Sequence, residues 1–235
     1  MNLNIFVKNN NLALILNIET ATKNCSVSLA DKGHVIAIKE LNDVNYSHGE
    51  NLHLFIDEII KQSNHTFKDI DAIAVSKGPG SYTGLRIGVS AAKGLCFSLD
   101  KPLISISTLT SLANAIDIEK DNYIIPLLDA RRMEVYSAVF DGNHNQVRET
   151  KAEVIDENSF LEFLGKGKVY FLGDGAEKCK EIIMHKNAVF LDGYFPSAKE
   201  MTKLSFEKYK KSDIEDVAYF EPFYLKDFIV STPKN

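Results

Sequence analysis

The chain lacks three features that would each define a class of protein. Its 235 residues carry 27 basic and 32 acidic side chains, a formal net charge of −5, so it has no strong basic excess for coating nucleic acid. No apolar run approaches the roughly 20 residues that a membrane-spanning helix requires. The N-terminus shows no long apolar core followed by a small-residue cleavage site. We therefore expect a cytoplasmic protein without membrane contact.

Cysteine and the common catalytic motifs are also scarce. Cys25, Cys96 and Cys179 lie far apart and form no C-x-x-C pair, which argues against a disulfide framework and a zinc site. The chain has no G-x-S-x-G nucleophile elbow, no H-E-x-x-H zinc helix and no Walker A loop. His48 and His53 would diverge by roughly 140° on a helix, so we expect surface or capping histidines. These motifs assign no catalytic or metal-binding residue.

The composition that remains, 45% apolar and 25% charged, is that of a globular protein. Apolar patterning, a D-K-G hairpin turn and an S-H-G-E capping box predict an α/β order of elements. The first half is predicted to contain three strands at residues 12–18, 25–30 and 34–39 and then a helix of about four turns from Glu50. A strand at 70–75, a helix at 83–98, a strand at 103–106 and a short helix at 108–116 follow.

The second half repeats this order. The strand-end acid Glu19 is followed 110 residues later by Asp129, and the hairpin-turn residue Asp31 is followed by Asp141 at the same interval. A strand, a G-D-G turn and a predicted helix at 176–185 then match the strand, G-P-G loop and helix of the first half. We infer a duplicated βββαβα unit. The predicted lobes are residues 12–108 and 109–226, with the C-terminal segment as a candidate to pack back on the first lobe.

Two such units would enclose a cleft lined by turns and acids. That arrangement suits a nucleotide with a divalent ion, because helix N-termini bind phosphate and carboxylates hold a metal through water. The candidate nucleotide-binding residues are the first strand-end acid and the G-P-G-S loop, namely Glu19, Gly78, Gly80 and Ser81. Each also has a structural alternative, since a strand-end acid is often a cap and a glycine can simply supply positive φ.

The helix after the G-P-G loop has one face almost without side chains. Gly84, Gly88, Ala91 and Ala92 recur at spacings of three and four, at a cost of up to ~1 kcal/mol per glycine in helix propensity. Such a face lets another backbone approach closely, within the domain or across a subunit interface. Arg86 stands near the helix N-terminus, the unfavourable end for a cation, which indicates a carboxylate or phosphate partner or else a solvated side chain.

Several of these segments together resemble one family, the bacterial TsaB (YeaZ) family, across about residues 12 to 226. They are I-E-T-A-T at 18–22, C-S-V at 25–27, G-P-G-S-Y-T-G-L-R-I-G at 78–88, D-A-R-R-M-E-V-Y at 129–136, G-D-G-A at 173–176 and P-F-Y-L at 222–225. The long glycine stretch is the most specific of them. The resemblance implies a duplicated actin-like ATPase fold of the RNase H-like type, in agreement with the repeat inferred above.

The resemblance also implies a role in making threonylcarbamoyladenosine beside the tRNA anticodon, as partner of the homologous catalytic subunit TsaD and of the ATPase TsaE, with tRNA bound indirectly. In the catalytic relatives two histidines four residues apart bind the metal. The matching positions here are Thr108 and Leu112, which cannot replace them. Glu19 stands where the family more usually has aspartate. A non-catalytic scaffold that needs no cofactor of its own is therefore the first hypothesis, with the complex interface as the candidate place for ATP or ADP.

The scaffold hypothesis places the partner-facing residues on two helices of the first lobe: Gly84, Arg86, Gly88, Ala91, Ala92, Leu52 and Phe55. It predicts that Gly88→Leu stops co-purification with TsaD and leaves the monomer folded. The same surface is the candidate interface of a homodimer. Two alternatives stay open: a nucleotide-binding, metal-dependent transferase or metallopeptidase in its own right, and nucleotide sensing through the loop at 78–81 beside the scaffold role.

Overall fold

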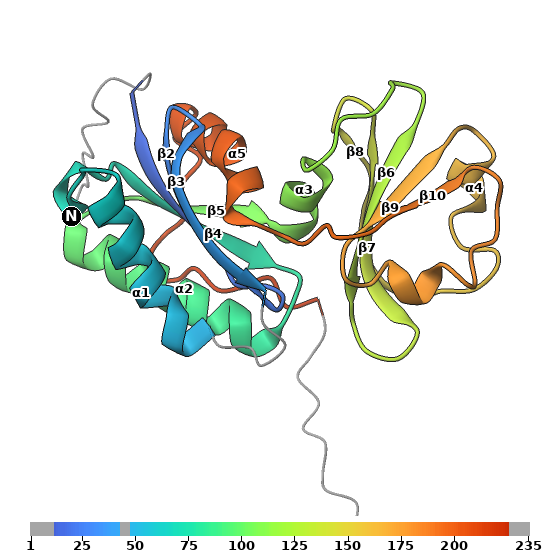
Figure 1. Cartoon of the computed structure of the whole chain (residues 1–235), viewed down its shortest axis with the longest axis horizontal. Helices are drawn as coiled ribbons and strands as arrows, with labels where there is room; N and C mark the ends of the chain where they lie inside the picture. Colours follow the sequence, from blue (N-terminus) through green and yellow to red (C-terminus); the bar gives the residue numbers. More distant parts are fainter. Residues whose placement is uncertain (1–11, 43–47, 226–235) are drawn as a thin grey trace, which may run out of the picture.

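The computed structural model describes residues 12–42 and 48–225, which form two lobes (Figure 1). The first half of the chain forms β1 (Leu14–Glu19), β2 (Asn24–Asp31), β3 (His34–Asn42), α1 (His48–Gln62), the 3-10 helix η1 (Phe67–Asp69), β4 (Ala72–Gly78), α2 (Tyr82–Leu99), β5 (Leu103–Ser107) and α3 (Thr108–Ala113). The second half forms β6 (Tyr123–Asp129), β7 (Glu134–Asp141), β8 (Gln146–Val154), α4 (Leu161–Leu164), β9 (Val169–Leu172), the 3-10 helix η2 (Glu177–Cys179), β10 (Ala188–Leu191) and α5 (Ala198–Lys210).

The two lobes share one sheet topology. The strand order is β3-β2-β1-β4-β5 in the first sheet and, read from the matching edge, β8-β7-β6-β9-β10 in the second. In each sheet the first three strands are antiparallel and the last two run parallel to the central strand. The strands β2 and β7 begin and end 110 residues apart. The predicted duplicated α/β fold is confirmed.

Burial follows from position in the sheet. The central strand β1 pairs with β2 on one side and β4 on the other, and all six of its residues are buried, which explains its nearly continuous apolar sequence. The edge strand β3 is mostly exposed. The helices α1 and α2 lie side by side on one face of the first sheet, and their inner sides complete its main core (Figure 1).

The last helix of each half packs on the sheet of the other half. Ala198 and Met201 of α5 pack against Ile15 of β1, on the face of the first sheet opposite α1 and α2 (Figure 1). Leu109 and Leu112 of α3 are buried in a core with second-lobe strand residues. This exchange joins the lobes through buried apolar surface. Among the described residues no helix combines the length and apolar character needed to cross a membrane.

One predicted helix is wrong. The segment at 176–185 forms only the short 3-10 helix η2 followed by turns. Most of its backbone bonds span three residues, for example from the N–H of Cys179 to the carbonyl of Ala176 and from the N–H of Ile182 to the carbonyl of Cys179. The Cys179 thiol also donates to the carbonyl of Gly175, which turns a buried side chain back toward the glycine turn. The counterpart of α2 in the second lobe is therefore a tight turn.

Candidate functional site

The turn that follows β1, residues Thr20 to Thr22, lies against the glycines of the G-P-G loop and of α2. A Cβ added at Gly80 would overlap the carbonyl of Ala21, and one added at Gly84 would overlap the carbonyl of Thr20. Thr20 Oγ1 donates to the Gly84 carbonyl at 2.8 Å, and the Ser81 N–H donates to the Ala21 carbonyl at 2.6 Å. The glycines of this face of α2 thus make contacts inside the lobe.

This packing corrects most of the predicted partner-facing residues. Gly84 and Gly88 are buried, and a Cβ at Gly88 would overlap Thr20 Oγ1, so Gly88→Leu would disrupt the lobe instead of leaving it folded. The side chains of Ala92, Leu52 and Phe55 belong to the main core. These five positions are wrong as partner contacts, because helical spacing cannot tell which neighbour a small face approaches. Arg86 and Ala91, by contrast, reach the surface of α2.

His48, at the start of α1, also contacts the turn after β1. It is 1% exposed, and its Nε2 lies 2.7 Å from the carbonyl of Thr22, so the prediction of a surface or capping histidine is wrong for His48, whereas His53 is exposed. Burial lowers the pKa of His48. The turn after β1 therefore contacts both helices, α2 through Thr20 and Ala21 and the start of α1 through Thr22. The sequence signal that could have revealed this was the run of small and hydroxyl residues directly after a buried strand.

Glu19, at the end of β1, is fully buried. Its Oε1 accepts the N–H of Ala21 at 2.6 Å and the hydroxyl of Ser76 at 2.7 Å. Desolvation by burial raises its pKa to about 7, while these hydrogen bonds act in the opposite direction. A carboxyl group in this position stabilises the turn from inside through Oε1, while its Oε2 is buried without a hydrogen-bond partner.

Asp129, at the end of β6, is the counterpart of Glu19 and is neutralised in another way. The Lys178 ammonium forms an ion pair with the Asp129 carboxylate and donates to the carbonyls of Arg132 at 2.8 Å and Glu134 at 2.7 Å. Arg131 and Arg132 both have positive φ, 72° and 51°, in this turn. The ammonium thus lies at the end of β6, between the Asp129 carboxylate and two backbone carbonyls.

The glycine turns of the two lobes are built alike. Gly78 has a φ of 103° and ends β4, and Ser81 caps α2 by accepting the Gly84 N–H at 3.2 Å. In the second lobe Gly173 has a φ of 109°, and a Cβ there would overlap the carbonyl of Leu127 in β6. Close approach of backbones accounts for these glycines. Nucleotide binding by Glu19, Gly78, Gly80 and Ser81 stays a prediction.

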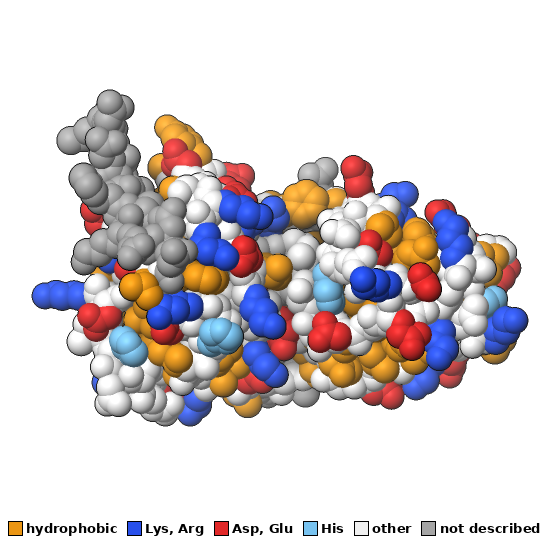
Figure 2. Space-filling model, turned by 90° about the horizontal axis from the view of Figure 1, so that it is seen from above, with side chains coloured by type: hydrophobic (Ala, Val, Ile, Leu, Met, Phe, Trp, Pro, Cys, Tyr) orange, Lys and Arg blue, Asp and Glu red, His pale blue; other side chains and the backbone are white. Residues whose placement is uncertain are grey.

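The donor set for a catalytic metal is weak. Thr108 and Leu112, the positions that match the histidine pair of the catalytic relatives, are both completely buried in α3. Within residues 12–42 and 48–225 no three His, Cys, Asp or Glu side chains are grouped so that they could hold a metal ion. Figure 2 shows Lys and Arg interspersed with Asp and Glu on one face of the molecule, without an extended basic area.

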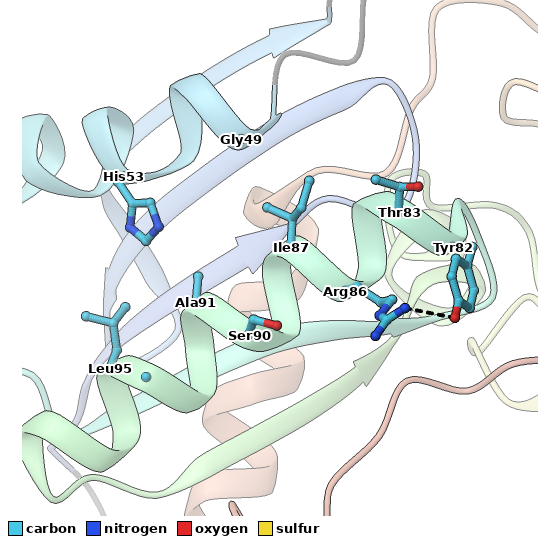
Figure 3. Close-up of a pocket in the computed structure, with 10 residues that line it drawn as sticks. Gly49, His53, Tyr82, Thr83, Arg86, Ile87, Ser90, Ala91 and Leu95 are labelled. Atoms are coloured by element: carbon cyan, nitrogen blue, oxygen red, sulfur yellow. Dashed lines mark hydrogen bonds between the residues drawn. The ribbon is translucent and has the colours of Figure 1, made fainter.

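A groove of about 730 Å³ lies between α1 and α2 on the outer side of the first lobe (Figure 3). We call its lining the α1–α2 face. The lining residues are Gly49 and His53 from α1 and Tyr82, Thr83, Arg86, Ile87, Ser90, Ala91, Gly94 and Leu95 from α2. Two large apolar side chains on the same helices, Leu54 and Phe97, are 59% and 86% exposed. This exposed apolar surface is a candidate protein interface.

The relatives of the chain point to one family. The family model of TsaD, tRNA N6-adenosine threonylcarbamoyltransferase, matches residues 42–232. The chain is also 32% identical to the tRNA threonylcarbamoyladenosine biosynthesis protein TsaB of Haemophilus influenzae, over 91% of this chain and 93% of the relative. The chain belongs to the TsaB family. Its fold is that of YeaZ from Pseudomonas aeruginosa, with a TM-score of 0.78 at 22% identity over 91% of this chain and 100% of the other.

A more distant match links this TsaB-family chain to the catalytic relatives. It is 34% identical to the tRNA N6-adenosine threonylcarbamoyltransferase of Staphylococcus saprophyticus, over 46% of this chain and 36% of that protein. The G-P-G-S-Y-T-G-L-R-I-G stretch, the most specific segment of the family resemblance, has a structural role in this chain. In this chain its glycines dock α2 on the turn after β1, and its exposed Arg86 reaches the α1–α2 face.

Proposed function

We propose that this chain acts in tRNA threonylcarbamoyladenosine biosynthesis as a non-catalytic subunit that binds TsaD through the α1–α2 face. The names of its relatives support the pathway. In this proposal TsaE joins the pair in a higher complex, tRNA is bound mainly by the partners, and the interface of the complex is the place for ATP or ADP. In the absence of TsaD, the same face is the candidate surface for self-association.

The observation that carries this proposal is the exposed lining of the α1–α2 face. Ser90, Ala91 and Gly94 are small, so a helix could approach α2 closely there, and Ile87 and Leu95 add apolar surface beside them. The TsaD family model aligns with residues 42–232, a range that includes both helices. A homologous partner would thus bring an equivalent helix pair, and two such pairs can join around an approximate two-fold axis.

The non-catalytic part of the proposal is supported by the second lobe and by α3. Lys178 occupies the strand end beside Asp129, and Leu112 offers no donor atom where the catalytic relatives have a histidine. A metal-dependent transferase or peptidase would need a donor set at one of these positions. We therefore assign catalysis to the partner and the positioning of that partner to this chain.

Filling the groove tests the proposal. Ser90 is exposed on α2, so Ser90→Trp leaves the lobe folded and blocks the approach of a partner helix. We expect wild-type chain to co-elute with TsaD from the same genome and Ser90→Trp to lose at least about 90% of the complex. Lys203→Trp is the control, since Lys203 is exposed on α5, across the sheet from the groove.

Reconstitution provides the functional measurement. Threonylcarbamoyl transfer to tRNA by TsaD and TsaE should require this chain and should fall with Ser90→Trp but not with Lys203→Trp. Full transfer activity without the chain would contradict the proposed role. An intact complex with Ser90→Trp would contradict the α1–α2 face as the binding surface without contradicting the proposed role.

A further inference from the structure

The α1–α2 face carries one permanent charge, on Arg86. The other lining residues are small, apolar, hydroxylic or aromatic, apart from the titratable His53. Arg86 Nη1 donates to the Tyr82 hydroxyl at 2.9 Å, and the guanidinium lies 5.2 Å from the centre of the Tyr82 ring. Figure 3 shows both side chains at the N-terminal end of α2, with this bond dashed. A guanidinium has five N–H donors, so several remain for a ligand.

Tyr82 is itself held by the segment that follows α5. The rings of Tyr82 and Tyr224 pack with centroids 5.1 Å apart. The N–H of Phe223 donates to the carbonyl of Lys77 at 2.7 Å, and Lys93 of α2 donates to the carbonyl of Phe220 at 3.0 Å. The segment therefore lies along α2 and is attached at both of these points. Tyr224, Tyr82 and Arg86 form a continuous row of contacts that fixes the direction of the guanidinium.

A docked helix would remove Arg86 from water. A charge that loses its hydration without gaining a partner costs several kcal/mol, whereas a carboxylate can bind a guanidinium through two parallel hydrogen bonds. The partner surface must therefore supply an Asp or Glu side chain opposite Arg86. A second copy of this chain meets that demand poorly, since a two-fold dimer would face the groove with its own lining, which contains no Asp or Glu.

Resting on the proposed function, we propose that Arg86 selects the partner by pairing with a carboxylate on a helix of TsaD, and that Tyr224 is a positioning residue that acts through Tyr82. The occupant of the groove is thus a homologous protein with an acidic residue at this point, in preference to a second copy. Partners that lack the acid are rejected by the unpaired guanidinium.

The first test measures the dissociation constant of the complex with TsaD by titration calorimetry at low and high salt. We expect Arg86→Glu to weaken binding by about a hundredfold or more and Arg86→Lys by roughly tenfold, because lysine keeps the charge and loses the planar fork. Lys211→Glu, an equal change of charge sign at an exposed position after α5, should change it less than twofold. The salt dependence of binding should decrease in Arg86→Ala.

The second test separates positioning from general stability. Tyr224→Ala should weaken TsaD binding several-fold in the wild-type background and have no effect in the Arg86→Ala background, whereas Tyr224→Phe keeps the ring and should bind normally. Equal effects of Tyr224→Ala in both backgrounds would overturn the positioning role, and normal binding by Arg86→Glu would overturn the selection role. If the wild-type chain self-associated as tightly as it binds TsaD, and if this self-association depended on Arg86, the preference for TsaD over a second copy would be overturned. Failure of wild-type chain to bind TsaD would instead reject the proposed function.

Discussion

The two lobes keep the same sheet and differ in the helices that cover it. The first lobe has α1 and α2, of 15 and 18 residues, where the second has α4 and η2, of four and three residues. Both lobes retain close packing of a glycine turn against the first strand of the lobe or the turn after it: Gly80 and Gly84 pack against the turn after β1, and Gly173 packs against β6. We call this contact the strand-turn-glycine junction. It stabilises the fold of each lobe, whereas the long helices of the first lobe provide an additional exposed surface. Among the described residues the second lobe has no counterpart of this pair of long helices.

The strand-end carboxyl groups show a second difference between the lobes. Glu19 is fully buried, and desolvation raises its pKa to about 7. Asp129 is exposed in part and is paired with Lys178. One lobe thus stabilises its turn with a carboxyl group that tends to hold its proton, and the other with an ion pair at the surface. The two sites should respond to different conditions, pH in the first lobe and salt in the second.

Glycine substitutions on α2 should give the largest effect. Gly84→Ala places a methyl group against the Thr20 carbonyl, so we expect the free energy of unfolding to fall by about 3 kcal/mol or more. Gly94→Ala, the same change on the same helix, meets no atom within 4 Å and should raise it by up to about 1 kcal/mol through helix propensity. Urea unfolding measures both.

A partner-binding role for the glycine face would reverse this outcome. In that case Gly84→Ala would leave the isolated chain as stable as the wild type and would weaken only the complex with TsaD. Equal destabilisation by Gly84→Ala and Gly94→Ala would show that helix propensity and local context, and not contact with Thr20, decide the effect. Either result would also remove the structural distinction between the junction and the helix surface.

The sequence predicts the strands and the duplication well because both depend on local signals. Buried strands such as β1 and β6 give continuous apolar runs, and the strand-end acids Glu19 and Asp129 mark the repeat. It predicts the interface poorly, because Gly84 and Gly88 have the same spacing whether they meet Thr20 or another protein. The buried state of His48 depends on Thr22, 26 residues away, which no local pattern contains. The positions of Gly84, Gly88 and His48 relative to the turn after β1 follow only from the three-dimensional structure.

Glu19→Gln should remove a pH dependence of stability. Burial raises the Glu19 pKa from its ordinary 4.5 to about 7, so the folded state holds this proton more tightly than the unfolded chain. The stabilisation is complete below pH 4.5 and is lost as the pH rises to 7, a change of about 3 kcal/mol. Glutamine keeps a neutral acceptor for Ala21 and Ser76. The stability of Glu19→Gln relative to wild type should therefore increase by that amount between pH 4.5 and pH 8 in urea unfolding.

His48 makes a contribution to stability that changes with pH in the opposite direction. Burial lowers its pKa, so its contribution is present above pH 6.5 and is lost as the pH falls, opposite to that of Glu19. Because His48 is unchanged in Glu19→Gln, its contribution cancels in the difference between the two proteins. A difference that stays constant from pH 4.5 to pH 8 would mean that Glu19 ionises in the folded chain as it does in the unfolded chain.

Lys178→Met should have the smallest effect and should depend on salt. The ammonium binds the Asp129 carboxylate and two carbonyls, but both partners of the ion pair are partly exposed, so we expect a loss of about 1 kcal/mol in the free energy of unfolding that shrinks as salt is added. Lys180→Met is the matched control, since Lys180 makes a more exposed pair with Asp192 at 3.6 Å and should change stability by less than about 0.5 kcal/mol.

Asp129→Asn added to Lys178→Met should recover part of the loss, because it removes the carboxylate that has lost its partner. If Lys178→Met instead showed the pH dependence expected of Glu19 and no response to salt, the two strand ends would be stabilised in the same way, and the division between the lobes would rest on their helices alone.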